Sequence, residues 1–138
     1  MSLKPELEAI SLCERVLQDL FRRDAVTLVN VHNGVSSQAF PTMVPVLYAF
    51  AQLRAHPDPF TYQFKVLNPE GVLVSQSSSG QVEGLVNPNG MHKVISVFSG
   101  LLFPTPGVYR VVLEVDGVEI GSIPYEVEHI VVNQPAAV

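Results

Sequence analysis

The stretch that decides the fold is Phe103–Val127, which reads FPTPGVYRVVLEVDGVEIGSIPYEV. Apolar and polar residues alternate from Tyr109 onward, which is the period of a half-buried β-strand. Asp116 and Gly117 then supply the positive φ angles of a two-residue hairpin turn, and a second alternating run leads the chain back. The stretch therefore predicts a β-hairpin whose turn lies at Asp116 and Gly117.

Tyr109 stands two residues after the turn-forming sequence PTPG, at the start of the first strand of this hairpin. A tyrosine in this place is typical of the tyrosine corner of Greek-key sandwiches, in which the ring is buried and the hydroxyl bonds a backbone carbonyl. We therefore expect a structural role for Tyr109.

Further strand patterns lie upstream of the hairpin. They are FTYQFKVL at 60–67, which the turn NPEG follows, MHKVISVFSGLLF at 91–103 and PVLYAFAQL at 45–53. Short strands separated by turn residues predict an all-β fold, an antiparallel two-sheet β-sandwich of about seven to nine strands.

The first part of the chain fits two structures. Apolar residues between Leu7 and Phe21 recur at helical spacing, and Pro5 stands where a helix could begin. The sequence TLVNVHNG at 27–34, which follows, is typical of a strand. The residue pattern alone leaves both a helix and a strand open for residues 5–23.

Three motifs give the chain a resemblance to a known family. They are Cys13-Glu14, Phe40-Pro41 and the sequence FPTPGVYR at Phe103–Arg110. With them, the chain resembles a bacterial family of small single-domain proteins of unknown function with an immunoglobulin-like β-sandwich, over about Ala9–Val127. The resemblance implies a strand around Ala9–Cys13 with at most a short helical turn after it, and it implies no known activity.

Length and composition limit the classes of protein. A chain of 138 residues predicts a single domain over 1–138, with a core at about 9–129 and a flexible tail at 130–138. A net charge of -5 argues against nucleic acid and anionic membranes as partners. The N-terminus lacks a signal-peptide pattern and no apolar run is long enough to span a bilayer, so we expect a cytoplasmic protein. The single cysteine, Cys13, has apolar neighbours and is expected to be a buried hydrophobe.

The sequence carries no catalytic or metal-binding pattern. His32, His56, His92 and His129 each stand alone rather than at metal-ligand spacing. The motifs GxSxG, GxGxxG and GxxxxGK are all absent, and the serines at 75–79 have no neighbouring base. Glu114, Glu126 and Glu128 fall on the outward positions of strands. We therefore expect no catalytic residue, no metal, no cofactor and no enzyme activity.

Protein contacts are the function that composition favours. Only 15% of the residues are charged, whereas 47% are hydrophobic, which suggests that a partner covers some apolar surface. In PVLYAFAQL one face is apolar from Leu47 to Leu53, and Tyr48 and Phe50 point the other way. We expect Tyr48 and Phe50 to form an interface in a homodimer or with a protein partner, so that the protein is a binding or assembly module.

Two alternatives stay open at this point. The apolar segment at 16–21 could fold over Tyr48 and Phe50 as a short helix, which would cover them within one chain. A small-molecule or metal-dependent enzyme on a sandwich scaffold is the alternative function, and it would need polar groups that converge only in the folded protein.

Overall fold

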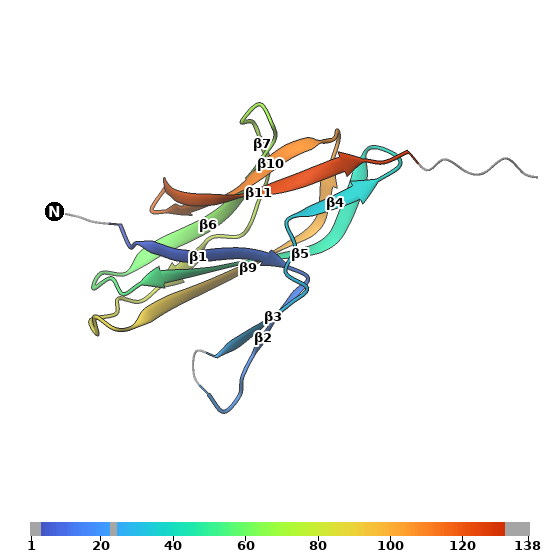
Figure 1. Ribbon diagram of the computed structural model, residues 1–138. Helices are drawn as coiled ribbons and strands as arrows, with labels where there is room; N and C mark the ends of the chain where they lie inside the picture. The colour runs from blue at the N-terminus through green and yellow to red at the C-terminus, as the bar shows by residue number, and fades with distance from the viewer. Residues whose placement is uncertain (1–3, 23–24, 132–138) are drawn as a thin grey trace, which may run out of the picture.

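The computed structural model describes residues 4–22 and 25–131, and these ranges contain strands and no helix (Figure 1). The strands are β1 Leu7–Cys13, β2 Arg15–Gln18, β3 Val26–Val29, β4 Gly34–Ser37, β5 Thr42–Arg54, β6 Phe60–Leu67, β7 Leu73–Gln76, β8 Gly80–Val82, β9 Met91–Phe103, β10 Gly107–Val115 and β11 Val118–His129. The predicted all-β fold is confirmed. No helix long enough to cross a membrane occurs among these residues.

Three strands form the first sheet, in the order β1-β5-β9. Its two long strands, β5 and β9, pair along their whole length, from Thr42 opposite Phe103 to Arg54 opposite Met91. β1 pairs with β5 over a shorter stretch, which ends at Cys13 opposite Tyr48. The part of β5 before Tyr48 therefore has a ladder partner on one side only.

The second sheet has the order β4-β11-β10-β6-β7, and β8 also pairs with β6. Its centre is the hairpin β10–β11, which turns at Asp116 and Gly117 with φ angles of 48° and 80°. These positive angles at both central residues match the right-handed twist of the two strands. β6 pairs with the other edge of β10 and carries the second hairpin, β6–β7.

One strand pair departs from the antiparallel pattern that we expected. β4 runs parallel to β11, with Gly34 opposite Glu126 and Ser37 opposite His129. β4 pairs only with the part of β11 that follows Pro124, a residue that has no N–H group to give to a ladder. The chain leaves the first sheet after β1 and enters the second sheet as β4. The arrangement of the two sheets is that of an immunoglobulin-like sandwich.

The core lies between the two sheets. The largest side chains without exposed surface are Tyr109, Tyr125, Phe64, Phe103, Leu12, Leu47, Leu53 and Leu113. They come from both sheets. In each sheet, the face on which the apolar residues of the alternating strands lie is packed against the other sheet. Cys13 is also buried, as expected, and burial raises the pKa of its thiol.

The segment between β1 and β4 is a two-stranded ribbon and not a helix. β2 and β3 pair from Arg15 opposite Val29 to Gln18 opposite Val26. The predicted strand at Ala9–Cys13 is confirmed as part of β1, and the short helical turn that the resemblance allows after it does not occur among the described residues. In the ribbon, each strand supplies hydrogen-bond partners for the backbone groups of the other. The strand-like sequence after the turn therefore favours a strand over a helix for the residues before it. The tail expected at 130–138 lies mostly outside the described residues.

Candidate functional site

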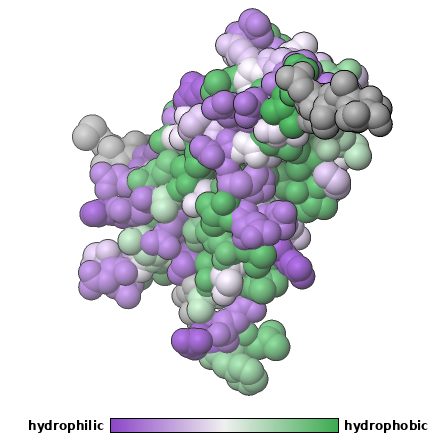
Figure 2. All heavy atoms as spheres, turned by 45° about the vertical axis from the view of Figure 1, so that its right-hand side comes forward, coloured by the Kyte–Doolittle hydropathy of each residue, from purple (hydrophilic) through white to green (hydrophobic). Residues whose placement is uncertain are grey.

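The β2–β3 ribbon projects away from the two sheets (Figure 1). Leu20 and Phe21 lie just beyond β2, at its far end, with 93% and 95% of their surface exposed. The Asp19 carboxylate accepts hydrogen bonds from the backbone N–H groups of Phe21 at 2.7 Å and Arg22 at 3.0 Å. These two bonds hold the pKa of Asp19 below its usual value. The turn therefore presents two large apolar side chains to the solvent, and Figure 2 shows apolar residues at the lower end of the molecule, where the ribbon lies.

A pocket of about 390 Å³ lies at the base of the ribbon. It is lined by Glu14, Asn30, His32, Gly34, Val35, Met43, Val44, Pro45, Val46 and Tyr125. The first three belong to the segments where the chain enters and leaves the ribbon, and the others belong to β4, β5 and β11. The pocket is thus built where the chain switches from one sheet to the other.

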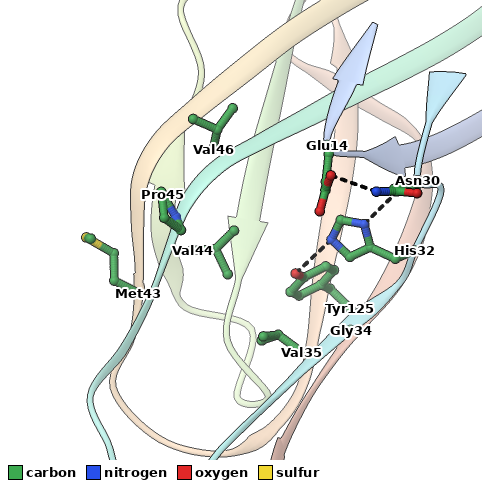
Figure 3. A pocket seen from close by; sticks show the side chains of 10 residues that line it. All are labelled: Glu14, Asn30, His32, Gly34, Val35, Met43, Val44, Pro45, Val46 and Tyr125. Carbon is green, nitrogen blue, oxygen red and sulfur yellow. Dashed lines mark hydrogen bonds between the residues drawn. The ribbon is translucent and has the colours of Figure 1, made fainter. Parts of the chain in front are cut away.

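Four of these residues form a continuous polar chain (Figure 3). Asn30 Nδ2 donates to Glu14 Oε2 at 2.8 Å, and Nδ1 of His32 lies 2.9 Å from the carbonyl oxygen of Asn30. Because a carbonyl can only accept, Nδ1 carries the hydrogen, and Nε2 of a neutral His32 is then the acceptor for the Tyr125 hydroxyl at 3.3 Å. The hydrogen bonds therefore fix the tautomer and the orientation of His32.

The polar chain holds the side chains of His32 and Tyr125 in place. Tyr125 has no exposed surface, and burial raises its pKa to about 12, so the phenol keeps its proton at neutral pH. Both nitrogens of His32 are hydrogen-bonded within the protein, so a bound ligand would have to replace Tyr125 as the partner of Nε2. Glu14 is the remaining reactive group, and it is an exposed carboxylate at the mouth of the pocket.

The opposite wall of the pocket is apolar and comes from the part of β5 that β1 does not reach. Met43, Pro45 and Val46 are exposed there, and Val44 points into the core. No lysine or arginine lines this pocket, so Glu14 supplies its only formal charge at neutral pH. An apolar group attached to a cation would match this combination.

The two aromatic residues expected at an interface differ in exposure. Phe50 is 6% exposed, so neighbouring residues of the same chain cover it, and Tyr48 is half-buried. The segment at 16–21 does not cover them as a helix, because it forms β2 and the turn after it. On the same outer side of the first sheet, Val46 and Val97 are exposed. Tyr48 therefore belongs to a partly apolar surface, whereas Phe50 is buried and contributes little to it.

The other residues singled out from the sequence do not line the pocket, although Tyr109 pairs with Tyr125 across the β10–β11 ladder. Tyr109 is buried, and its hydroxyl donates to the carbonyl of Thr105 at 2.7 Å, which is the bond of a tyrosine corner. Asp116 accepts the backbone N–H of Thr61 at 2.9 Å, so its side chain joins the hairpin turn to β6. This bond, with the Thr61 hydroxyl and Lys4, holds the pKa of Asp116 below its usual value.

Two of the four histidines lie together, since His56 and His92 both pack their rings edge-on against Phe60, at centroid distances of 6.2 Å and 4.9 Å. His32 lines the pocket, and His129 lies beside Phe40. The described residues contain no group of three metal-ligating side chains.

Sequence reasoning missed the residues that now stand out, namely Leu20, Phe21, Glu14 and Asn30. The signal for the first two was present, since two large apolar residues between Asp19 and Arg22 are unusual in a turn. Glu14 belongs to the Cys13-Glu14 motif, but nothing in the sequence indicated its contact with Asn30, because only the pairing of β2 with β3 brings the two residues together.

Fold and site together define an immunoglobulin-like β-sandwich that carries an inserted apolar ribbon and a pocket at its base. The chain belongs to a family of unknown function, DUF6941, whose pattern matches residues 8–128. This confirms the resemblance to a small family of unknown function that the motifs predicted. No curated protein matches the chain.

Two solved structures are similar in fold. An immunoglobulin-like protein from Pseudomonas aeruginosa is 13% identical with a TM-score of 0.40, and the match covers 91% of this chain and 98% of that one. The alkylpurine DNA glycosylase AlkC from Pseudomonas fluorescens, bound to DNA containing an abasic site analog, is 12% identical with a TM-score of 0.46. That match covers 70% of this chain and 28% of the glycosylase, so the chain spans less than a third of that protein's length.

Proposed function

We propose that the protein is a non-catalytic binding module that acts through protein–protein contacts in the cytoplasm. The observation that supports this is the projecting ribbon, which exposes Leu20 and Phe21 at its end. The net charge of -5 makes a protein a better partner for it than nucleic acid or an anionic membrane.

The physical argument concerns what stabilises the ribbon. A two-stranded ribbon by itself is marginally stable in water, and the strands of this one have four residues each. At about 25 cal/mol per Å² of apolar area, burial of each exposed side chain contributes on the order of 2 kcal/mol. Contact with another protein would therefore both order the ribbon and supply binding free energy.

The outer side of the first sheet enlarges this surface. β2 lies close to β5, and the exposed valines Val46 and Val97 and the half-buried Tyr48 lie on the outer side of β5 and β9. The proposed surface therefore consists of the ribbon with these three residues. The partner is a second copy of the chain or another protein.

Site-specific photo-crosslinking tests this proposal. A photoreactive phenylalanine analogue replaces Phe21 in the full chain, which is expressed in its native host and irradiated there. The matched control carries the same analogue in place of Val86, which is 84% exposed in the loop between β8 and β9. We expect a defined protein adduct from position 21 that the additional substitution Leu20→Ser removes. Equal adducts from both positions, or none from position 21, would contradict the proposal.

A further inference from the structure

We propose that the partner is a second copy of the chain, and that the ribbon end of each protomer occupies the pocket at the base of the other protomer's ribbon. This inference rests on the proposed function and adds to it the identity of the partner and the site on the partner to which the ribbon end binds. It concerns Leu20, Phe21 and Arg22 on one side and the pocket that contains Glu14 on the other.

The first step is the chemical match between the two surfaces. The ribbon end presents two large apolar side chains followed by Arg22, whose side chain is 82% exposed. The pocket presents an apolar wall at Met43–Val46 and a single formal charge, the Glu14 carboxylate. Apolar residues next to a cation therefore meet an apolar wall next to an anion.

The second step is the state of the two charged groups before contact. Glu14 is held through Oε2 by Asn30, and its Oε1 has no hydrogen-bond partner among the described residues. Arg22 uses its Nε to bond Asp19 at 3.3 Å, which leaves its terminal N–H groups able to bond a second carboxylate. Each group is therefore oriented by its own protomer and still has capacity to bond the other.

The third step is symmetry. The apolar end and the pocket lie at opposite ends of one ribbon, so two ribbons placed side by side in opposite directions bring each end to the other's base. This arrangement is a closed two-fold dimer, in which the same contact forms twice. β2 and β3 pair only with each other in the described ranges, so each has a free edge along which such ribbons can lie.

The fourth step explains why the pocket receives side chains rather than an added strand. The free edge of β5 before Tyr48 contains Pro45, which has no N–H group to donate. Proline at an exposed edge hinders pairing with another strand. The space beside this edge is therefore open to the side chains of a partner and poorly suited to its backbone.

Charge exchange with the purified full chain tests the inference. Sedimentation equilibrium gives the dimer dissociation constant of the wild type, of Arg22→Glu, of Glu14→Arg and of the double variant. We expect each single change to weaken the dimer at least about tenfold, and the double change, which restores an ion pair of reversed sign, to recover most of that loss. The matched control exchanges Arg110 and Glu119, an exposed pair at 3.5 Å on the second sheet, and leaves dimerisation unchanged.

A wild type that stays monomeric up to high micromolar concentration overturns the inference, and so does a dimer that neither single change weakens. If Glu14→Arg fails to fold, as judged by its circular dichroism and melting curve, Glu14→Gln and Arg22→Gln replace the single variants and must each weaken the dimer. A monomeric chain that still crosslinks to another protein through position 21 would remove this inference and leave the proposed function standing. A monomer without any such crosslink would remove both.

Discussion

Tyr109 joins two parts of the structure through a single side chain. Its ring packs edge-on against Phe103 at a centroid distance of 4.8 Å, and Phe103 stacks on Tyr125 at 5.4 Å. Its hydroxyl reaches back to Thr105, in the turn between β9 and β10. The side chain therefore fixes the crossing between the two sheets as well as filling the core.

We expect Tyr109→Phe to lower the free energy of unfolding by about 1 kcal/mol, because it removes one hydrogen bond and keeps the ring. Tyr109→Ala should cost about 3–5 kcal/mol, since it also leaves a cavity among the buried aromatic rings. Urea denaturation monitored by circular dichroism measures both. Equal losses for the two variants would contradict this division between the hydroxyl and the ring.

His92 is the buried polar residue at the other end of the sandwich. It is nearly covered, and its Nε2 accepts the backbone N–H of His56 at 3.2 Å, which requires the unprotonated form. Burial lowers the pKa of His92 below its usual value. The folded protein therefore binds a proton at this residue less readily than the unfolded chain does.

The sign of the pH dependence follows from that lowered pKa. The stability that neutral His92 contributes is fully present above the unfolded pKa of about 6.5 and is lost as the pH falls through the folded pKa. We expect the melting temperature of the wild type to fall below pH 6.5, and His92→Gln to show a smaller fall over the same range. An identical pH profile for the two proteins would show that His92 does not titrate on unfolding.

At the scale of elements, the ribbon and the sandwich are largely separate structures. β2 and β3 belong to neither sheet, and none of their residues belongs to the core between the two sheets. β1 and β4, which flank the ribbon, each have their own ladder partner, β5 and β11. The sandwich therefore does not depend on the ribbon for its core.

Replacement of residues 16–28 by Asn-Gly should leave the sandwich folded. The two residues can form a tight turn between Arg15 and Val29, which pair with each other in the ribbon. We expect a change in the free energy of unfolding of less than about 1 kcal/mol at concentrations where both proteins are monomeric, because no core contact is removed. Thermal melting checks this, and a loss of cooperative unfolding would show that the ribbon is part of the folding unit.

At the scale of the whole molecule, the histidines and carboxylates are spread over both sheets and the loops. The described residues bring no three potential metal ligands together, and His32 is already bonded at both nitrogens. We expect the purified protein to contain no stoichiometric zinc or iron by elemental analysis. A bound metal that His32→Ala or His92→Ala releases would contradict this expectation and reopen the enzymatic alternative.

Much of the fold followed from local pattern. The alternation in Phe103–Val127 and the Asp116-Gly117 turn predicted β10, β11 and the turn that joins them, because side-chain period and turn geometry act between neighbours in sequence. The parallel pairing of β4 with β11 had no such signal. It joins Gly34–Ser37 to Glu126–His129 across most of the chain, so no local pattern encodes it.

The candidate site depended still more on distant contacts. The sequence by itself determined the all-β class and the buried faces, since these depend on period, composition and turn chemistry, and it places the apolar residues Leu20 and Phe21 side by side. Only the tertiary structure decided that these two residues end a projecting ribbon, that Phe50 is covered within the chain, and that Glu14, Asn30, His32 and Tyr125 meet. The physical reason is that a ladder or a hydrogen bond between residues far apart in sequence forms only when the strands of the whole chain have paired into their two sheets.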